Sequence, residues 1–159
     1  MMRAIAILAL VFLAVAASAA EDREVSEVEV IALERAAHAG DKAAIVALFN
    51  ARADGAVAEE IDIALGSLIR SNPNLFLESL SQSWRANCDA CLPGLVGNTG
   101  DALVDRFDDQ MKELKKRRAA LEGVNNQALL SLRAKCLTAL DADIREVASA
   151  IQSEAGGAK

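Results

Sequence analysis

The chain has 159 residues, a formal net charge of −6 at pH 7 and apolar side chains at 53% of its positions. This length is typical of a single domain with one hydrophobic core. Phosphate binding depends on clustered Lys and Arg, so a mildly acidic chain without a dominant basic face is a poor candidate for binding nucleic acid or an anionic membrane surface. Only 3% of the residues are aromatic and Tyr is absent, which favours a core of Leu, Ile, Val and Ala on close-packed helices.

The N-terminus has the three parts of a secretory signal peptide. Arg3 precedes an apolar run over residues 4–17, and small residues follow up to Ala20. A charged start, a short apolar core and an A-x-A-like site are typical of a leader that is removed on export. The run is shorter than the roughly 20 residues that a membrane-spanning helix needs, which leaves an uncleaved anchor as the alternative. The sequence therefore predicts a signal peptide over residues 1–19 and a periplasmic or secreted bacterial protein, from a Gram-negative source, with no membrane span after cleavage.

Apolar residues recur at steps of three and four from residue 22 to about residue 85, as one face of a helix requires. Four helices are expected here, and pairs of turn-forming residues separate them: Gly40-Asp41, Asp54-Gly55 and Asn72-Pro73. Asp41 and Asn72 are good N-caps, and proline is tolerated at the first position of a helix. The third of these helices is predicted to run from about Val57 to Arg70.

This region partly overlays itself when it is shifted by 32 residues, so that residues 31–33 fall on 63–65 and Leu48 falls on Leu80. The spacing resembles that of helical-repeat solenoids of the tetratricopeptide and HEAT type over residues 24–85. The resemblance implies two tandem helix pairs that bury their faces against each other. The Trp, Gly and Tyr positions of the tetratricopeptide pattern are missing, and two unrelated amphipathic hairpins of similar length remain the alternative.

The second half of the chain is built on longer elements. Residues 86–100 are rich in Cys and Gly and are expected to form a loop. One helix is predicted from Asp101 to Glu122, where Gly123 ends it, and the last from about residue 126 to 152. A short connection makes these two helices an antiparallel hairpin over residues 101–153.

The predicted fold is therefore all-α, with a single helical domain over residues 20–153 and a flexible tail over 154–159. Its helix hairpins are expected to stack as a short α-solenoid-like array or as an orthogonal bundle. The long antiparallel hairpin ends the domain.

Three cysteines raise the question of redox, metal or structural chemistry. Cys88 and Cys91 form a C-x-x-C pair, and Cys136 lies on the apolar stripe of the last helix. Haem attachment is excluded because it requires His at the position of Leu92, and a thioredoxin-like centre is not expected because it requires strands. A zinc site requires a fourth ligand, for which only the distant His38 is available. In an oxidising compartment a structural disulfide is the expected outcome.

We expect this disulfide to join Cys136 to Cys88 or to Cys91. Such a bridge closes a long loop and stabilises the fold by about 4 kcal/mol in the chain-entropy model. The residues between the C-x-x-C pair and the hairpin are numerous enough for the pair to fold back over it. A direct Cys88–Cys91 bridge is the alternative, and it would be the more reducible form.

Two charged runs mark the helix that starts near residue 101. Asp101, Asp105, Asp108 and Asp109 lack the spacing of a calcium loop, and acids are favoured in the first turns of a helix by its dipole. The basic run over residues 112–118 pairs with acids one turn earlier, Asp108 with Lys112 and Glu113 with Arg117. Both runs are interpreted as solvated faces and not as cation or phosphate sites.

No catalytic motif is present in the sequence. The chain has one His and lacks the nucleophile elbow, phosphate loop and zinc-protease patterns that assemble an active site; a paired-carboxylate enzyme is the weakest alternative. We therefore expect a non-enzymatic protein without metal or cofactor.

The first hypothesis for its role is an exported binding or scaffolding module for a peptide or an envelope protein. Leu75 and Trp84 are the candidate contact surface, although both residue types are more often buried. The second hypothesis is a periplasmic thiol-redox or metal-binding protein that uses the C-x-x-C pair. The sequence leaves the oligomeric state open.

Overall fold

The computed structural model describes residues 23–100, 103 and 105–157, so the expected signal peptide over 1–19 lies outside the described residues. The described part of the chain is helical apart from one short parallel pair, in which Arg23 lies opposite Ala51 and Glu24 opposite Arg52. The all-α class predicted from the apolar periodicity is confirmed. None of the described helices is both long enough and apolar enough to cross a membrane.

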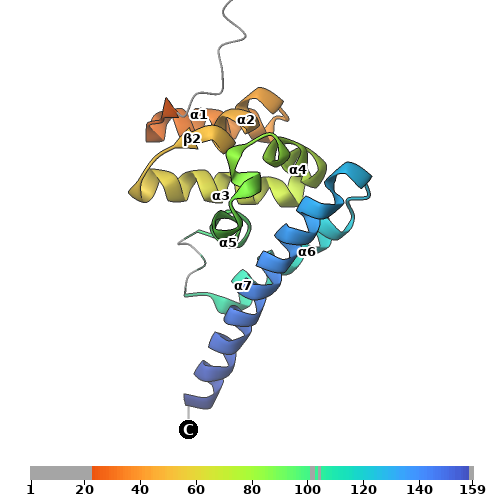
Figure 1. Cartoon of the computed structure of the whole chain (residues 1–159). Helices are drawn as coiled ribbons and strands as arrows, with labels where there is room; N and C mark the ends of the chain where they lie inside the picture. The colour runs from red at the N-terminus through yellow and green to blue at the C-terminus, as the bar shows by residue number, and fades with distance from the viewer. Residues whose placement is uncertain (1–22, 101–102, 104, 158–159) are drawn as a thin grey trace, which may run out of the picture.

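The elements of the N-terminal part are β1 (Arg23–Glu24), α1 (Glu27–His38), α2 (Lys42–Asn50), β2 (Ala51–Arg52), α3 (Gly55–Ser71) and α4 (Pro73–Ser81). The central helix is α3. It packs against α1, α2 and α4 on one side and against α5 (Leu92–Gly97) on the other (Figure 1). These four helices thus meet at α3.

The predicted caps define the starts of α2 and α4. The Asp41 carboxylate accepts hydrogen bonds from the backbone N–H groups of Ala43, at 2.8 Å, and Ala44. Asn72 Oδ1 accepts one from Leu75 N at 3.3 Å, and Pro73 occupies the first turn. These side chains satisfy backbone donors that a helix start otherwise leaves without partners, which explains why the boundaries follow the sequence.

The core between these helices is apolar and tightly packed. The rings of Phe49 and Phe76, from α2 and α4, have centroids 5.4 Å apart. Both are fully buried, as are Ile45, Leu48, Ile61, Leu65, Ile69, Leu77 and Leu80. Burial of this many aliphatic side chains is the main source of stability in this part.

Residues 86–100 are not the uninterrupted loop that the sequence predicts. They form η1 (Trp84–Asn87), η2 (Asp89–Cys91) and α5. Leu92, Leu95 and Val96 of α5 are buried, and the helix packs against α3 and against α7 (Leu130–Gly157). This helix is too short to be stable alone, so its packing between two longer helices is what makes it form.

The long antiparallel hairpin is formed by α6 (Phe107–Glu122) and α7, which lie side by side in Figure 1, connected through η4 (Gln127–Leu129). Its inner face buries Leu114, Leu121, Cys136 and Leu140. The first helix starts at Phe107 and not at residue 101. The second continues to Gly157, into the stretch 154–159 that the sequence predicts as a tail, because Ser153, Glu154 and Ala155 contain no helix breaker.

Candidate functional site

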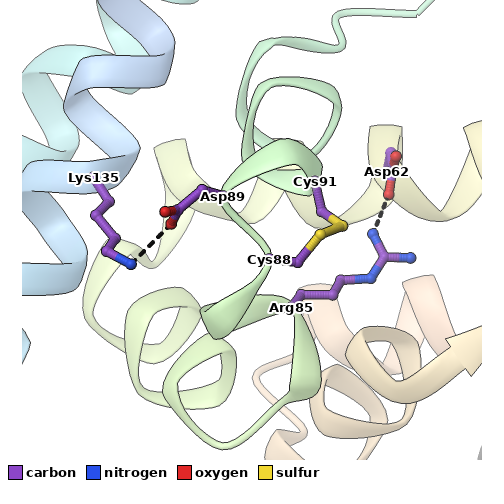
Figure 2. Close-up of a disulfide and its surroundings, with 6 residues drawn as sticks. All are labelled: Asp62, Arg85, Cys88, Asp89, Cys91 and Lys135. Carbon is purple, nitrogen blue, oxygen red and sulfur yellow. Dashed lines mark hydrogen bonds and ion pairs between the residues drawn. A yellow bond between two sulfur atoms is a disulfide. The ribbon is translucent and has the colours of Figure 1, made fainter.

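The structure joins Cys88 to Cys91 (Figure 2). It leaves Cys136 as a buried thiol. The Cα atoms of the bridged pair are 5.3 Å apart, in the range usual for disulfides. The expected bridge from Cys136 to one of the other two cysteines is therefore wrong, and the direct pairing, which was the alternative, is the one formed.

The reason lies in the direction of neighbouring side chains. The C-x-x-C segment does approach α7, but it presents Asp89, whose carboxylate lies 2.8 Å from Lys135 Nζ. Figure 2 shows the two sulfur atoms on the opposite side of this segment, toward Arg85 and Asp62. Residue 136 is turned about 100° from residue 135 around the helix, so its side chain points into the core. Burial raises the pKa of Cys136 to about 12, which makes the thiol unreactive.

The surroundings of the disulfide are polar and partly exposed. Arg85 is buried and forms an ion pair with Asp62, and its guanidinium lies 5.3 Å from the centre of the Trp84 ring. Arg52 lies over the same ring at 5.9 Å. Trp84 is 42% exposed, whereas Leu75 is only partly exposed and packs against the core. Of the two candidate contact residues, Trp84 is thus the one at the surface.

The single histidine takes no part in this region. His38 ends α1, and its Nε2 lies 3.2 Å from Ser67 Oγ and 3.7 Å from Glu34. Among the residues that the structure describes, no three His, Cys, Asp or Glu side chains are grouped so that they could hold a metal ion.

Arg117, in the basic run, is not on a solvated face. Its side chain is 3% exposed, and Nη1 donates hydrogen bonds to the carbonyl oxygens of Val96, at 2.9 Å, and Asn98, at 2.8 Å. A Cβ atom on Gly66 of α3 would lie 2.5 Å from Nη1. Burial lowers the pKa of Arg117, although Glu113 counteracts this at 3.4 Å. The guanidinium therefore binds the C-terminal end of α5, and the solvated-face interpretation is wrong for this residue.

Asp105, Asp108, Lys112, Lys115 and Lys116 are exposed, as expected, and Asp101 lies outside the described residues. One ion-pair partner differs from the prediction. Lys112 lies 3.0 Å from Asp109, which also pairs with Arg106. Hydrogen bonds from Lys112 and Arg106 lower the pKa of the Asp109 carboxyl. These groups are compensated locally and do not form a site.

A cleft of about 610 Å³ lies between α5, α6 and α7. Its walls combine apolar and polar side chains: Pro93, Gly94, Gly97, Asn98, Phe107, Gln110, Asp143, Glu146, Val147 and Ala150. The volume is in the range of ligand-binding pockets, which are usually apolar with a few well-placed polar groups. This cleft is the strongest candidate site in the described part of the chain.

Asp143 is the unusual residue of this cleft. Its Oδ2 atom is buried and has no hydrogen-bond partner within the described residues. A Cβ atom on Gly97 would lie 1.9 Å from this oxygen, so any side chain at position 97 would force the Asp143 carboxylate to move. Burial, and secondarily the charge of Glu146, raise the pKa of Asp143 to about 6.

Asp143 was missed by sequence reasoning, which assigned no role to the acids of the last helix. A signal was present, because residue 143 follows Leu140 by three and precedes Val147 by four positions. These steps place its side chain on the apolar stripe of the helix. A carboxylate on such a stripe is rarely buried without a partner, and this combination could have indicated a site.

Comparison with known proteins identifies no similar protein. No family model matches the chain, and neither a curated protein nor a solved structure is found to match it.

Proposed function

We propose that this protein is an exported, non-catalytic binding module that holds a peptide or a segment of an envelope protein in the cleft between α5, α6 and α7. The observation that carries the proposal is the cleft itself, about 610 Å³ in volume and bordered by three packed helices. Export rests on the signal peptide predicted over residues 1–19.

The lining of the cleft suits a peptide. Phe107 and Val147 offer apolar contact area, while the side-chain amides of Asn98 and Gln110 can both donate and accept hydrogen bonds. A peptide backbone presents the complementary donors and acceptors. The long α7 supplies one wall of the cleft, and rigid helices hold a binding surface more precisely than loops do.

The experiment is site-specific photo-crosslinking in the living source cell. A photoreactive residue replaces Gln110 in the cleft or, as the matched control on the same helix, the exposed Lys116. We expect position 110 to give a discrete adduct in which the same peptide is identified in every repeat. Position 116 should give no such adduct. The proposal is contradicted if both positions give the same products or if neither gives any. N-terminal sequencing of the exported chain tests the predicted cleavage after residue 19.

A second candidate function is thiol–disulfide exchange at Cys88 and Cys91. The observation in its favour is that the C-x-x-C pair is bridged within itself and only half-buried, beside the exposed Trp84. In the exchange, a thiolate of a partner dithiol attacks one sulfur and forms a mixed disulfide. This attack releases the other cysteine as a thiolate. The second partner thiol then attacks the partner's sulfur in the mixed disulfide, which releases the remaining cysteine and leaves the partner oxidised as a disulfide.

This candidate is tested by equilibrating the folded protein in glutathione buffers of graded ratio and counting alkylated cysteines by mass spectrometry. A redox function requires that Cys88 and Cys91 become reduced in buffers that leave the fold intact. If the bridge opens only when the protein unfolds, the pair is a structural link. Binding of zinc to the reduced protein would instead favour the metal-binding form of this hypothesis.

A further inference from the structure

We infer that the cleft between α5, α6 and α7 binds a cationic group, an ammonium or guanidinium attached to an apolar body, and that Asp143 is its counter-ion. This inference rests on the proposed function and names the chemistry of its ligand. In a peptide the group would be the side chain of Lys or Arg next to an apolar residue.

The first argument is the unsatisfied carboxylate. Asp143 Oδ2 is buried without a partner in the described part of the chain, and a buried polar atom of this kind is costly unless a hydrogen bond or an opposite charge compensates it. Gly97 of α5 approaches this oxygen and has no side chain to offer. Asp143 also lines the cleft, where a cation beside its carboxylate would compensate the charge that no described residue neutralises.

The second argument is that the nearby cations are already engaged. The described lining of the cleft contains no Lys or Arg. Arg117 is bound to Val96 O and Asn98 O at the end of α5, and Arg106 at the start of α6 is paired with Asp109. α5 itself carries no charged residue, and Asp143 is therefore not neutralised from α5 or by these two arginines.

The third argument is the charge of the cleft and of the chain. Glu146 lies one helical turn from Asp143 and lines the same cleft, so the two carboxylates reinforce each other at the position of the ligand. The chain carries a net charge of −6, which attracts cations over a longer range. An anionic ligand would meet repulsion from both carboxylates, and a neutral one would leave Oδ2 without a charge partner.

The fourth argument fixes the apolar part of the ligand. Pro93, Phe107, Val147 and Ala150 line the cleft beside the carboxylates. A bare metal ion would gain nothing from these residues, and the described side chains offer no set of three metal ligands there. An alkyl or aryl chain with a terminal cation satisfies both parts of the lining.

The test uses three probes of the same shape and different charge: phenylbutylamine, phenylbutanol and phenylbutyrate. Binding to the mature protein is followed at pH 7.5 by chemical-shift changes of backbone amides on α5 and α7. We expect the amine to bind about tenfold more tightly than the alcohol, with the shifts centred on Gly97 and Asp143, and the acid not to bind.

The matched variants are Asp143→Asn and Asp141→Asn, which make the same charge change on the same helix. Asp141 lies outside the cleft lining and pairs with Arg118, which also contacts Glu122. We expect D143N to lose about tenfold in affinity for the amine and D141N to change it less than about twofold. Since Asp143 packs against Gly97, the amide spectrum of D143N without ligand and its affinity for phenylbutanol show whether the variant keeps the fold.

The source of the cation is distinguished by a second pair of probes, the blocked dipeptides acetyl-Phe-Lys-amide and acetyl-Phe-Gln-amide. Tighter binding of the Lys dipeptide than of phenylbutylamine indicates a peptide ligand, and the reverse indicates a free amine. Equal binding of amine and alcohol, or an unchanged amine affinity in D143N, overturns the inference while a cleft-specific crosslink still upholds the proposed function. Absence of amine binding also overturns the inference, and the crosslinks then decide the proposed function alone.

Discussion

Two flanks of the C-terminal end of α5 show opposite solutions to the burial of a charge. On one flank the guanidinium of Arg117 has two backbone carbonyls and Glu113 as partners. On the other flank Asp143 packs against Gly97 with one oxygen left without a partner. Both charges are held by the same short helix, but only the first is compensated within the described fold. A compensated charge stabilises the protein, and an uncompensated one is expected at a functional site.

The N-terminal layer, which runs from β1 to α4, differs from the surroundings of both Arg117 and Asp143. Its buried side chains are almost entirely apolar, and the polar ends of α2 and α4 are capped by Asp41 and Asn72. Mutations in this layer should therefore change stability alone. Around α5, some mutations should change mainly stability and others mainly binding. Four predictions test this contrast, from the largest expected effect to the smallest.

The largest effect is expected from Phe76→Ala in the N-terminal core. The ring is fully buried against Phe49, and its removal leaves a cavity that costs about 3–5 kcal/mol of unfolding free energy. Urea denaturation of the mature protein measures this change. Phenylbutylamine binding in the remaining folded fraction should be unchanged, and an altered affinity would contradict the separation of the core from the cleft.

Arg117→Met is expected to cost about 3 kcal/mol, because the carbonyls of Val96 and Asn98 lose their donor in a buried position. The exposed Lys116→Met is the control, and it should change the free energy of unfolding by less than about 0.5 kcal/mol. A similar result for both variants would mean that Arg117 lies at the surface after all. Hydrogen exchange of α5 amides should increase selectively in R117M.

Removal of the disulfide by the double change Cys88→Ala and Cys91→Ala is expected to cost about 2 kcal/mol, the chain-entropy value for so short a loop. A bridge to Cys136 would give about twice that. Thiol titration gives an independent check: Cys136 should not react in the folded protein and should react once the chain is unfolded. One thiol that reacts in the native state would indicate a different pairing.

The smallest effect is a pH dependence that originates at Asp143. Its pKa of about 6 in the folded protein lies above the ordinary value of 3.8, so the folded state binds the proton more tightly than the unfolded state. The stabilisation is therefore present below pH 4 and is lost as the pH rises through 6. After allowance for partial solvent exposure, we expect this carboxyl to lower the free energy of unfolding by about 1 kcal/mol between pH 5 and pH 7.5.

Urea unfolding of the wild type and of Asp143→Asn at both pH values measures this difference. The variant should lack this component, while the contributions of all other groups cancel between the two proteins. A pH dependence that is identical in both proteins would show that the carboxyl titrates normally. Added phenylbutylamine should remove the penalty at pH 7.5, because a bound cation favours the ionised form.

Much of the N-terminal layer was predictable from the sequence because its signals are local. The caps at Asp41 and Asn72 act on amides within the next turn, and the apolar steps of three and four report one helix face at a time. The long hairpin was predictable for the same reason. The start of α6 at Phe107 was missed because acids such as Asp105 fit an early helical turn as well as a connecting segment.

The candidate site was mostly unpredictable, and the cysteine pairing shows why. The sequence correctly brings the C-x-x-C segment near α7, yet one step around that helix decides whether Lys135 or Cys136 faces it. A rotation of about 100° per residue is below the precision with which two helices can be docked from periodicity alone. The direct bridge follows from that orientation.

By itself the sequence determined the helical class, the cap positions and the hairpin, because each depends on interactions within a few residues. Only the tertiary structure decided that α5 exists, that Arg117 is buried beneath Gly66 and that one oxygen of Asp143 is buried beside Gly97. These features depend on which helix faces are pressed together. Burial of a charge is a property of the surrounding elements and not of the residue that carries it.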